Sequence, residues 1–512
     1  MGVVKGVVLD ASALLAAAVD GDGNGCPASL LQGAEYLLRR LQYSKIPTGI
    51  SYEEGLSTVE VKLLQDKAKQ YSLDCFTLRS STIHDLAWGG NEGSFMYIVH
   101  EYKKEPFLGL SKTKWITVIL RSTGQVSDKD VKCASSSEIP NTIFINKLEE
   151  VPLTICLINK QAIGKEASIV GYLMKASREE DFAKRGAFPL NPTQNGLMFV
   201  SLNYELSISS QTENIDGVLH KATDEILSAE MSSSDFANRI VFTEGVQSLQ
   251  RYTECHLNCC VIDPFNNIYS ILDRLKIQQH LLGLENLNSE GHPRIRGPHF
   301  LKLNSFGEPQ LEKRLAEAKL SVPTIVKPQV ACGVADAHSM AIVFKVDDFK
   351  DLNVPLPAVL QEYVDHSSTL YKFYVLGKKV FYAIKKSIPN ADTLMRLSEG
   401  NGLKPLLFDS LKSLPVDKEK PQSGDMESNN SSSKGIDLQL VTEAANWLKK
   451  TLDLTIIGFD VVIQEGTGDH VIVDVNYLPS FKEVPDEIAI PAFFEAIKEK
   501  LEMKPTTAHK LA

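Results

Sequence analysis

The chain has 512 residues, a length that predicts two to four domains, with 43% hydrophobic and 23% charged residues, as in ordinary soluble proteins. Its 64 acidic residues against 54 basic ones give a formal net charge of −10, which argues against a general binder of nucleic acids or membrane surfaces. A small polyanion held in a local basic pocket stays compatible with this charge.

The apolar N-terminus, MGVVKGVVLDASALLAAAV, is interrupted by Lys5 and Asp10. It therefore predicts neither a signal peptide nor a membrane span, and we expect no membrane insertion. The eight cysteines are too sparse for a disulfide scaffold and fit a reducing compartment. We expect a cytoplasmic protein, with the nucleus left open as a second location.

Residues 1–160 show strand candidates at 3–9, 114–122 and 141–146, with helix-forming stretches between them. This alternation predicts an α/β domain of the Rossmann-like kind. The stretch VPLTICLINKQAIGKE, residues 151–166, is expected to be a last strand followed by a connector.

A second region begins near residue 165 with the strand candidate ASIVGYLM, residues 167–174. The segment 413–435 is poor in apolar residues and rich in Ser and charge, which predicts a flexible insertion. Apolar residues then recur at helical spacing over 438–452 and predict an amphipathic helix.

The segments GFDVVI and HVIVDVN are joined by QEGTGD, whose two glycines favour a hairpin. A turn symmetric about Thr467 places Asp460 across from Asp474, and Asn476 projects from the same face. Facing carboxylates on an apolar hairpin favour a divalent cation, and oxygen ligands of this kind suit Mg²⁺. The alternative is a register shifted by one residue, with one aspartate facing solvent.

Cations lie on the preceding strands. Lys327 is central in the apolar stretch VPTIVKPQV, where a lysine needs an anion or an edge to reach. If Gly377-Lys378 forms a two-residue turn, Lys372 and Lys385 share one face and Lys386 takes the other. Each lysine alone is usually a solvated surface charge, but together these lysines predict a binding site for the phosphates of ATP. No P-loop and no protein-kinase motif is present, so the nucleotide would lie between β-sheets.

Nine segments in order, among them VGYLM, LHKATDEIL, IVKP, QEYVDHSSTLYK and VDVNYLP, resemble the inositol 1,3,4-trisphosphate 5/6-kinase family, also called inositol-tetrakisphosphate 1-kinases. The length before them is similar to the longer plant-type branch. The resemblance implies an ATP-grasp core, with an inositol phosphate-binding domain at 165–265 and central and C-terminal domains at 266–500. It implies a monomer that uses ATP and two Mg²⁺ ions on an inositol polyphosphate substrate.

By position in the family's motifs, the resemblance implies three sets of site residues. The nucleotide set is Arg274, Lys327, Gln361, Glu362, Val364, Lys372 and Ser387. The metal set is Asp460, Asp474 and Asn476, and the catalytic set is Lys372, Asp474 and Asn476. The inositol phosphate set is Lys175, Arg178, Lys221, His338, Lys372, Asn476 and Ser480.

The chain departs from the family on the acceptor side. Ser177 stands where the family has a lysine, Ser480 replaces a usual glycine, and the loop before His338 is one residue longer. His220 and Lys221 either lie near the site or merely cap a helix or face water. The resemblance implies phosphorylation of an inositol tris- or tetrakisphosphate at the 1-, 5- or 6-hydroxyl, with reversible transfer to ADP that interconverts isomers. A carboxylate-amine ligase and a non-catalytic inositol phosphate sensor are the alternatives.

The N-terminal stretch VVLDASALLA, with TVILRS further on, resembles the haloacid-dehalogenase-like phosphatases. Those enzymes need a second acid two residues after the first, and here Asp10 is followed by Ser12. We therefore expect an inactive accessory domain.

Overall fold

The computed structural model describes residues 2–16, 28–78, 93–103, 115–122, 141–203, 206–230, 239–256, 259–288, 294–400, 402–412 and 435–503. They form two units, Met1–Tyr172 with Glu179–Val218, and Leu173–Arg178 with Leu219–Ala512. The expected flexible insertion at 413–435 lies outside the described residues except for Gly435. Within the described ranges, no helix combines the length and apolarity needed to cross a membrane.

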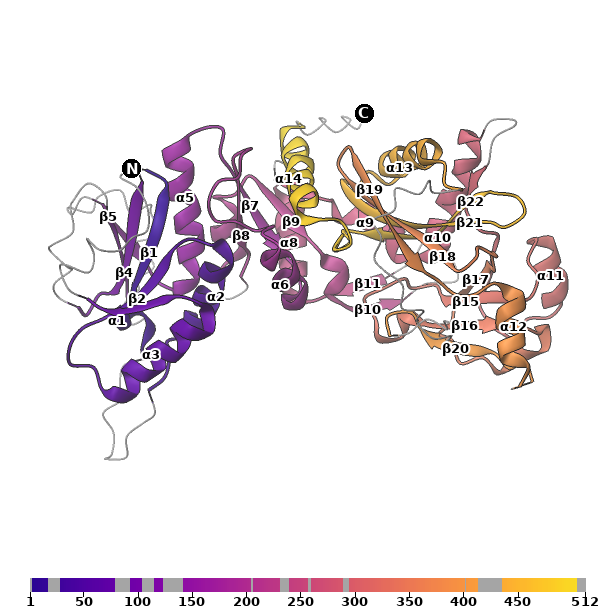
Figure 1. Ribbon diagram of the computed structural model, residues 1–512, viewed down its shortest axis with the longest axis horizontal. Helices are drawn as coiled ribbons and strands as arrows, with labels where there is room; N and C mark the ends of the chain where they lie inside the picture. Colours follow the sequence, from indigo (N-terminus) through magenta and orange to yellow (C-terminus); the bar gives the residue numbers. More distant parts are fainter. Residues whose placement is uncertain are drawn as a thin grey trace, which may run out of the picture. The chain divides into compact units, whose positions relative to one another are not determined.

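The first unit is built on a parallel sheet with the strand order β3-β2-β1-β4-β5-β6. Its central strands are apolar because both faces of such a sheet are covered. Helices α2, α3 and α5 pack beside it (Figure 1). The elements are β1 (Val4–Asp10), α1 (Ala11–Leu14), α2 (Ala34–Ser44), β2 (Thr48–Tyr52), α3 (Thr58–Tyr71), β3 (Asp74–Thr77), β4 (Ser94–His100), β5 (Trp115–Leu120), β6 (Thr142–Ile145), η1 (Leu148–Glu150) and α5 (Val151–Ile163).

The three strands expected in this region are present as β1, β5 and β6. The strand expected within 151–166 is wrong, because Val151–Ile163 is the helix α5. Its buried residues, among them Val151, Ile155 and Ile158, follow helical spacing, and Pro152 is tolerated in the first turn. The apolar pattern of a short segment is compatible with either a strand or a buried helix. Here the segment forms a helix that covers one face of the sheet.

The rest of the first unit follows α5. Strands β7 (Ser168–Leu173) and β8 (Leu197–Ser201) pair in parallel, so the strand expected at 167–174 is confirmed. The other elements here are α6 (Ala176–Lys184), α7 (Ile208–Thr212) and β9 (Gly217–His220); the division between the units falls within β7, α6 and β9.

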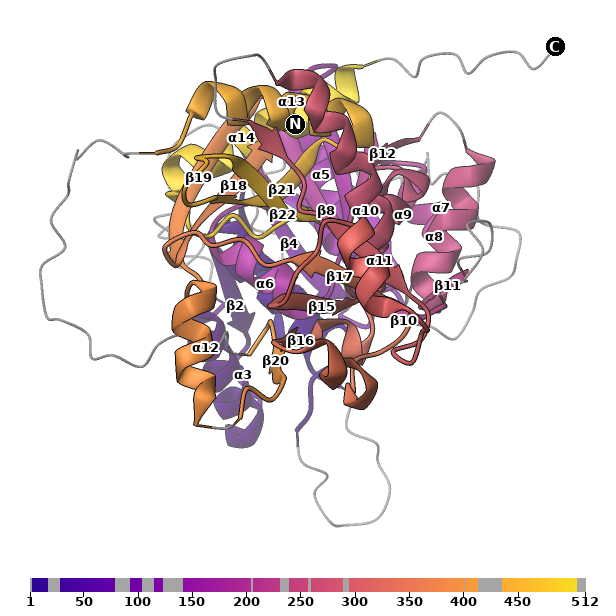
Figure 2. The same cartoon turned by 90° about the vertical axis from the view of Figure 1, so that its right-hand side faces the viewer.

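The second unit contains two five-stranded sheets, β13-β22-β21-β18-β19 and β14-β17-β15-β16-β20. They lie one above the other in both views (Figures 1 and 2). The strands are β10 (Ile226–Glu230), β11 (Arg239–Phe242), β12 (Cys260–Ile262), β13 (Ile295–Arg296), β14 (Phe300–Leu303), β15 (Thr324–Pro328), β16 (Ser339–Val343), β17 (Ala358–Glu362), β18 (Thr369–Leu376), β19 (Lys379–Lys386), β20 (Leu406–Asp409), β21 (Ile456–Ile463) and β22 (His470–Tyr477).

Helices pack around these sheets. They are η2 (Ala222–Asp224), α8 (Glu244–Cys255), α9 (Phe265–Leu272), α10 (Arg274–Leu281), η3 (Leu282–Leu287), α11 (Leu311–Glu317), η4 (Ala335–His338), η5 (Val346–Asp351), α12 (Ala391–Glu399), α13 (Leu438–Leu452) and α14 (Asp486–Glu502). Helix α13 has the bounds expected from its pattern, and Asp437 caps it by accepting the Leu440 N–H at 3.0 Å. Its buried face includes Val441, Ala445 and Leu448.

Candidate active site

The centre of the candidate site is a pair of carboxylates on two neighbouring strands. Asp460 of β21 lies directly across from Asp474 of β22, and Lys372 of β18 lies across from Asp460 on the other side. The expected register holds from Ile457 to Asp460, so Asp460 pairs with Asp474 as expected. Between Asp460 and the turn the register shifts by one residue, and Val461 pairs with Ile472. Burial raises the pKa of Asp460; the charge of Lys372 opposes this rise, and that of Asp474 adds to it.

This pair fits a magnesium ion. The Oδ1 atom of Asp460 is buried and has no hydrogen-bond partner among the described residues, which is costly for a carboxylate unless a cation meets it. Asn476 donates from its amide nitrogen to Asp474 Oδ2 at 3.0 Å, which leaves its amide oxygen outside that bond. The described residues contain no group of three or more His, Cys, Asp or Glu side chains placed to hold a metal ion. A site with so few carboxylates suits Mg²⁺, which keeps water and phosphate ligands.

Two lysines face these carboxylates from different sheets. Lys327 of β15 is half-buried and donates to the Val473 carbonyl of β22 at 3.3 Å, so its ammonium reaches the other sheet. Burial lowers the pKa of Lys327 to about 8, although Asp474 raises it. Within the part of the chain that the structure describes, Lys372 has no hydrogen-bond or ion-pair partner. Both lysines are thus placed to meet an anion beside the carboxylate pair.

Lys385 shares the face of Lys372, since Lys372 pairs with Ala383 and Lys385 with Leu370 along β18 and β19. Lys386 takes the opposite face, as expected from a two-residue turn. Lys385 differs from Lys372 in having a partner, because its ammonium is bound to Glu483. Burial would raise the pKa of Glu483, but its bonds to Lys385 and Tyr374 lower it to about 2. Sequence reasoning missed Glu483, since no local pattern links it to a strand almost a hundred residues earlier.

Arg274 begins α10 and is buried against the loop that follows β15. Its guanidinium donates to the carbonyls of Pro328, Val330 and Ala337 at 2.7, 2.8 and 3.1 Å, and to that of Ala331 at 3.2 Å. In this arrangement Arg274 fixes the path of the loop between β15 and His338. Contact with ATP phosphates stays a prediction for this residue.

Three of the expected nucleotide residues, Gln361, Glu362 and Val364, lie at the end of β17 and directly after it. Gln361 and Val364 are buried, and Ser387 donates its N–H to the Ser368 carbonyl at 2.8 Å. The carboxylate of Glu362 accepts two bonds from Arg296, at 2.7 and 2.9 Å, and a third from the His299 N–H at 2.9 Å. Burial works against ionisation here, but these bonds lower the pKa of Glu362. The Glu362 side chain therefore stabilises the end of β17 through bonds to other parts of the protein.

Arg296 was not expected from the sequence. It also donates to Gln464 Oε1 at 2.8 Å, and Gln464 begins the turn between β21 and β22. Arg296 thereby connects Glu362, one of the expected nucleotide residues, to the hairpin that carries the aspartates. The sequence offers only a basic residue in the stretch RIRG, a signal too weak to assign a role.

The residues expected to bind inositol phosphate have varied surroundings. Lys175 is exposed, whereas Arg178 is paired with Asp224. Lys221 is buried; its ammonium donates to the Tyr477 carbonyl and lies 5.2 Å from the centre of the Tyr477 ring. His338 Nδ1 lies 3.1 Å from Ser410 Oγ, and burial lowers its pKa. Ser480 is half-buried just beyond Asn476, and its role stays a prediction.

His220 is a core histidine. Its ring is fully buried, stacks on Phe265 at 4.3 Å and bonds the Asp263 carbonyl at 2.7 Å. Burial lowers its pKa to about 4, so it is neutral near pH 7. The Tyr477 hydroxyl accepts the Asp263 N–H at 2.9 Å and bonds the His220 carbonyl at 2.9 Å. This network anchors the end of β22 directly after Asn476.

The first unit has a separate polar cluster at the carboxyl end of β1. Asp10 accepts from the Ser12 N–H at 3.0 Å, the Tyr97 hydroxyl at 2.6 Å and the Lys103 ammonium at 2.6 Å. Lys103 also pairs with Glu53 at 2.9 Å. Asp10 is thus buried with its charge satisfied inside the unit, and Ser12 supplies no second acid. This agrees with the expectation of an inactive domain, which stays a prediction.

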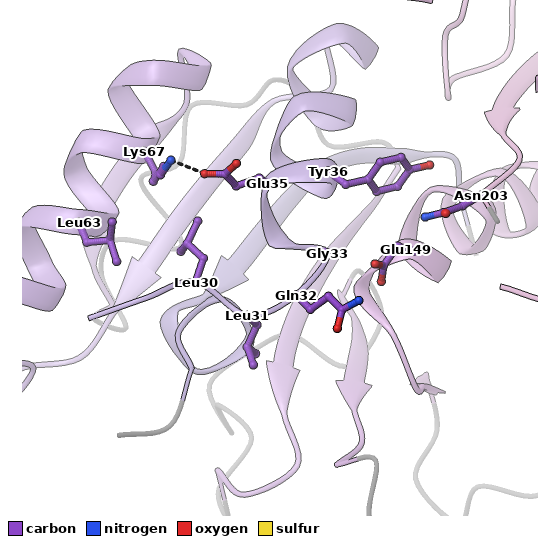
Figure 3. A pocket seen from close by; sticks show the side chains of 10 residues that line it. All are labelled: Leu30, Leu31, Gln32, Gly33, Glu35, Tyr36, Leu63, Lys67, Glu149 and Asn203. Atoms are coloured by element: carbon purple, nitrogen blue, oxygen red, sulfur yellow. Dashed lines mark hydrogen bonds and ion pairs between the residues drawn. The ribbon is translucent and has the colours of Figure 1, made fainter. Parts of the chain in front are cut away.

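A pocket of about 640 Å³ also lies in the first unit, beside the start of α2 (Figure 3). None of the expected site residues lines it. Glu149 lies so close to Gly33 that an added Cβ would be about 2.5 Å from its carboxylate. Glycine at 33 is therefore required for this packing, and we assign the pocket no role in the reaction.

Comparison with known proteins finds family matches in both units. The protein family described as ITPK4, N-terminal HAD-like domain, matches residues 1–161. The pre-ATP-grasp and ATP-grasp domains of inositol 1,3,4-trisphosphate 5/6-kinase match residues 169–268 and 289–495. Both resemblances found in the sequence, and the expected fold class, are confirmed by these matches.

Named relatives agree. The chain is 47% identical over 513 residues to inositol-tetrakisphosphate 1-kinase 6 of Oryza sativa subsp. indica, covering 98% of this chain and 90% of that protein. It is 28% identical over 296 residues to inositol-tetrakisphosphate 1-kinase of Danio rerio, covering 57% and 69%. The protein of Xenopus laevis with the same name is 26% identical over 297 residues. The chain therefore belongs to the inositol 1,3,4-trisphosphate 5/6-kinase family, whose members include these inositol-tetrakisphosphate 1-kinases.

Proposed function

We propose that this chain is an ATP-dependent kinase that transfers the γ-phosphate of ATP to a hydroxyl of an inositol polyphosphate. The observation that carries the proposal is the buried, unpartnered Oδ1 of Asp460 opposite Asp474, with Lys327 and Lys372 facing the pair from two sheets. Family membership supports the same activity. The proposal extends to two Mg²⁺ ions, a monomer, a cytoplasmic location and the kinase domain boundaries near 165, 266 and 500.

The chemistry requires positioning and neutralisation of charge more than covalent help. Bound Mg²⁺ would neutralise charge on the phosphate oxygens, and Asp460, Asp474 and Asn476 are the residues that would hold it. Lys327 and Lys372 would stabilise the charge that gathers on the transferred phosphoryl group. Because the transition state of phosphoryl transfer is loose, the attacking hydroxyl needs in-line placement more than a strong base.

The acceptor would lie beyond Asn476, on the side of Lys221, His338 and Ser480. Polar and cationic groups from several elements converge there, which suits a molecule with many phosphates and suits the carboxylate and amine of a ligase less well. The isomer and the hydroxyl attacked are left to experiment.

The test incubates purified full-length protein with ATP, Mg²⁺ and a panel of inositol tris-, tetrakis- and pentakisphosphates, and separates the products by chromatography. We expect a product with one more phosphate, and we expect Asp474→Asn to lower its rate of formation by about 100-fold or more. Asp347→Asn is the control, because Asp347 is 93% exposed on η5 and forms an exposed ion pair with Lys350, three residues later. Binding without turnover would overturn the kinase in favour of a sensor.

A further inference from the structure

One carboxylate lies among the cations on the acceptor side. Asp224, at the end of η2, accepts from Arg178 Nε at 2.5 Å and from Arg178 Nη2 at 3.3 Å. Both side chains are partly buried, with exposed fractions of 27% for Arg178 and 17% for Asp224. A two-point bond of this kind fixes the plane of the guanidinium as well as its position.

The surroundings of Asp224 are shared with the residues expected to bind the acceptor. Burial lowers the pKa of Lys221 to about 8, Asp224 raises it, and Arg178 lowers it, so all three charges interact. Burial raises the pKa of Cys332 in the loop after β15; Lys221 and Arg274 lower it, and Asp224 and Asp474 raise it, so these charges lie within electrostatic range of the loop.

Packing of the loop agrees with this placement. An added Cβ at Gly333 would lie only 2.6 to 2.7 Å from atoms of Ile226, two residues after Asp224. The loop that Arg274 holds therefore packs on the turn that carries Lys221 and Asp224. Asp224 thus contacts Arg178 directly and lies within electrostatic range of Lys221.

An anion in such a place has two opposed effects. It orders Arg178, and it cancels part of the positive potential that would attract a polyphosphate. We propose that Asp224 is a specificity-determining residue that limits the charge of the acceptor: its carboxylate disfavours inositol phosphates with more phosphate groups, while it keeps Arg178 in place for those with fewer. This inference rests on the proposed kinase function and names the property by which that site selects its substrate.

The effect should grow with the charge of the acceptor. Repulsion between Asp224 and the ligand increases with each phosphate near it, and salt screens it. Asp224→Asn keeps the size of the side chain and one oxygen for Arg178 but removes the charge. We expect it to lower KM by about two- to fourfold for each phosphate added across the panel, at an effective dielectric between those of protein and water.

The experiment measures KM and kcat for inositol tris-, tetrakis- and pentakisphosphate at low and high salt. The variants are Asp224→Asn, Asp224→Glu and the control Glu225→Gln. Glu225 is the adjacent acid, but its side chain bonds Thr243 Oγ1 at 3.3 Å and Arg178 is not its partner. We expect a charge-graded fall of KM in Asp224→Asn alone, reduced by salt, with kcat for the trisphosphate changed by less than about threefold.

An equal rise of KM for all acceptors in Asp224→Asn would overturn the proposal, since it would mean that Asp224 only orders Arg178. Equal behaviour of Asp224→Asn and Glu225→Gln would overturn it as well. Calorimetry also measures the affinity of the full-length protein and its variants for the same inositol phosphates. If the unaltered protein shows no turnover, the kinase function fails, but a charge-graded gain of affinity in Asp224→Asn still supports the role of Asp224.

Discussion

Lys372 and Lys385 are chemically identical and lie on the same face of one sheet, yet their surroundings differ. Lys385 is paired with Glu483, and although both lysines lower the pKa of Asp460, the effect of Lys372 is the larger. An ammonium already paired in the protein contributes little to a bound phosphate, whereas a free one aimed at the site contributes its whole charge. The distinction depends on which partner each side chain meets, so it belongs to the residue and not to the strand.

At this scale we predict unequal effects of two matched substitutions. Lys372→Met should lower kcat/KM for ATP-dependent turnover by about 100-fold or more, because it removes a cation from the transferred phosphate. Lys385→Met should lower it by less than about tenfold and should instead reduce stability, because the half-buried Glu483 loses its cationic partner and keeps the bond from Tyr374. Steady-state kinetics with denaturant unfolding of both variants checks this. Equal losses of kcat/KM would contradict the separate roles.

At the scale of elements, the hairpin of β21 and β22 was predictable and its supports were not. Alternating apolar residues and two turn glycines specify which side chains share a face, so the pairing of Asp460 with Asp474 followed from local pattern. The bond from Lys221 to the Tyr477 carbonyl joins residues 256 positions apart, and the four bonds of Arg274 depend on the path of a folded loop. Such contacts are set by packing of whole elements, which periodicity does not encode.

The end of this hairpin supports a second prediction. Gly458 of β21 lies across from Asn476, and an added Cβ there would be 2.9 Å from Pro479 Cγ. We predict that Gly458→Ala shifts the turn after β22, lowers the free energy of unfolding by about 1–3 kcal/mol and weakens Mg²⁺-dependent turnover. Gly400→Ala is the control, because no atom lies within 4 Å of its added Cβ and its φ is not positive. Urea unfolding and turnover are the measurements; equal effects of the two changes would refute the contact.

At the scale of the molecule, the expected nucleotide, metal and acceptor residues all belong to the second unit, with Lys175 and Arg178 carried by its short segment Leu173–Arg178. The first unit has its own buried ion pair, Asp10 with Lys103, at the end of its central strand. Each unit has a hydrophobic core of its own. A ligand that binds the second unit should therefore stabilise that unit, and a substitution in the interior of the first unit should destabilise the first unit.

We therefore predict two transitions in calorimetric unfolding of the full-length protein, because units with separate cores need not unfold together. ATP with Mg²⁺ should raise only the transition of the second unit, since a ligand stabilises the state that binds it. Asp10→Ala should lower only the other one, by an amount that reflects about 1–3 kcal/mol, because the buried Tyr97 hydroxyl loses its acceptor and, among the described residues, Lys103 keeps only Glu53 as a carboxylate partner. Its turnover per folded molecule should match the unaltered protein. Loss of turnover in folded Asp10→Ala protein would show that the first unit takes part in the reaction.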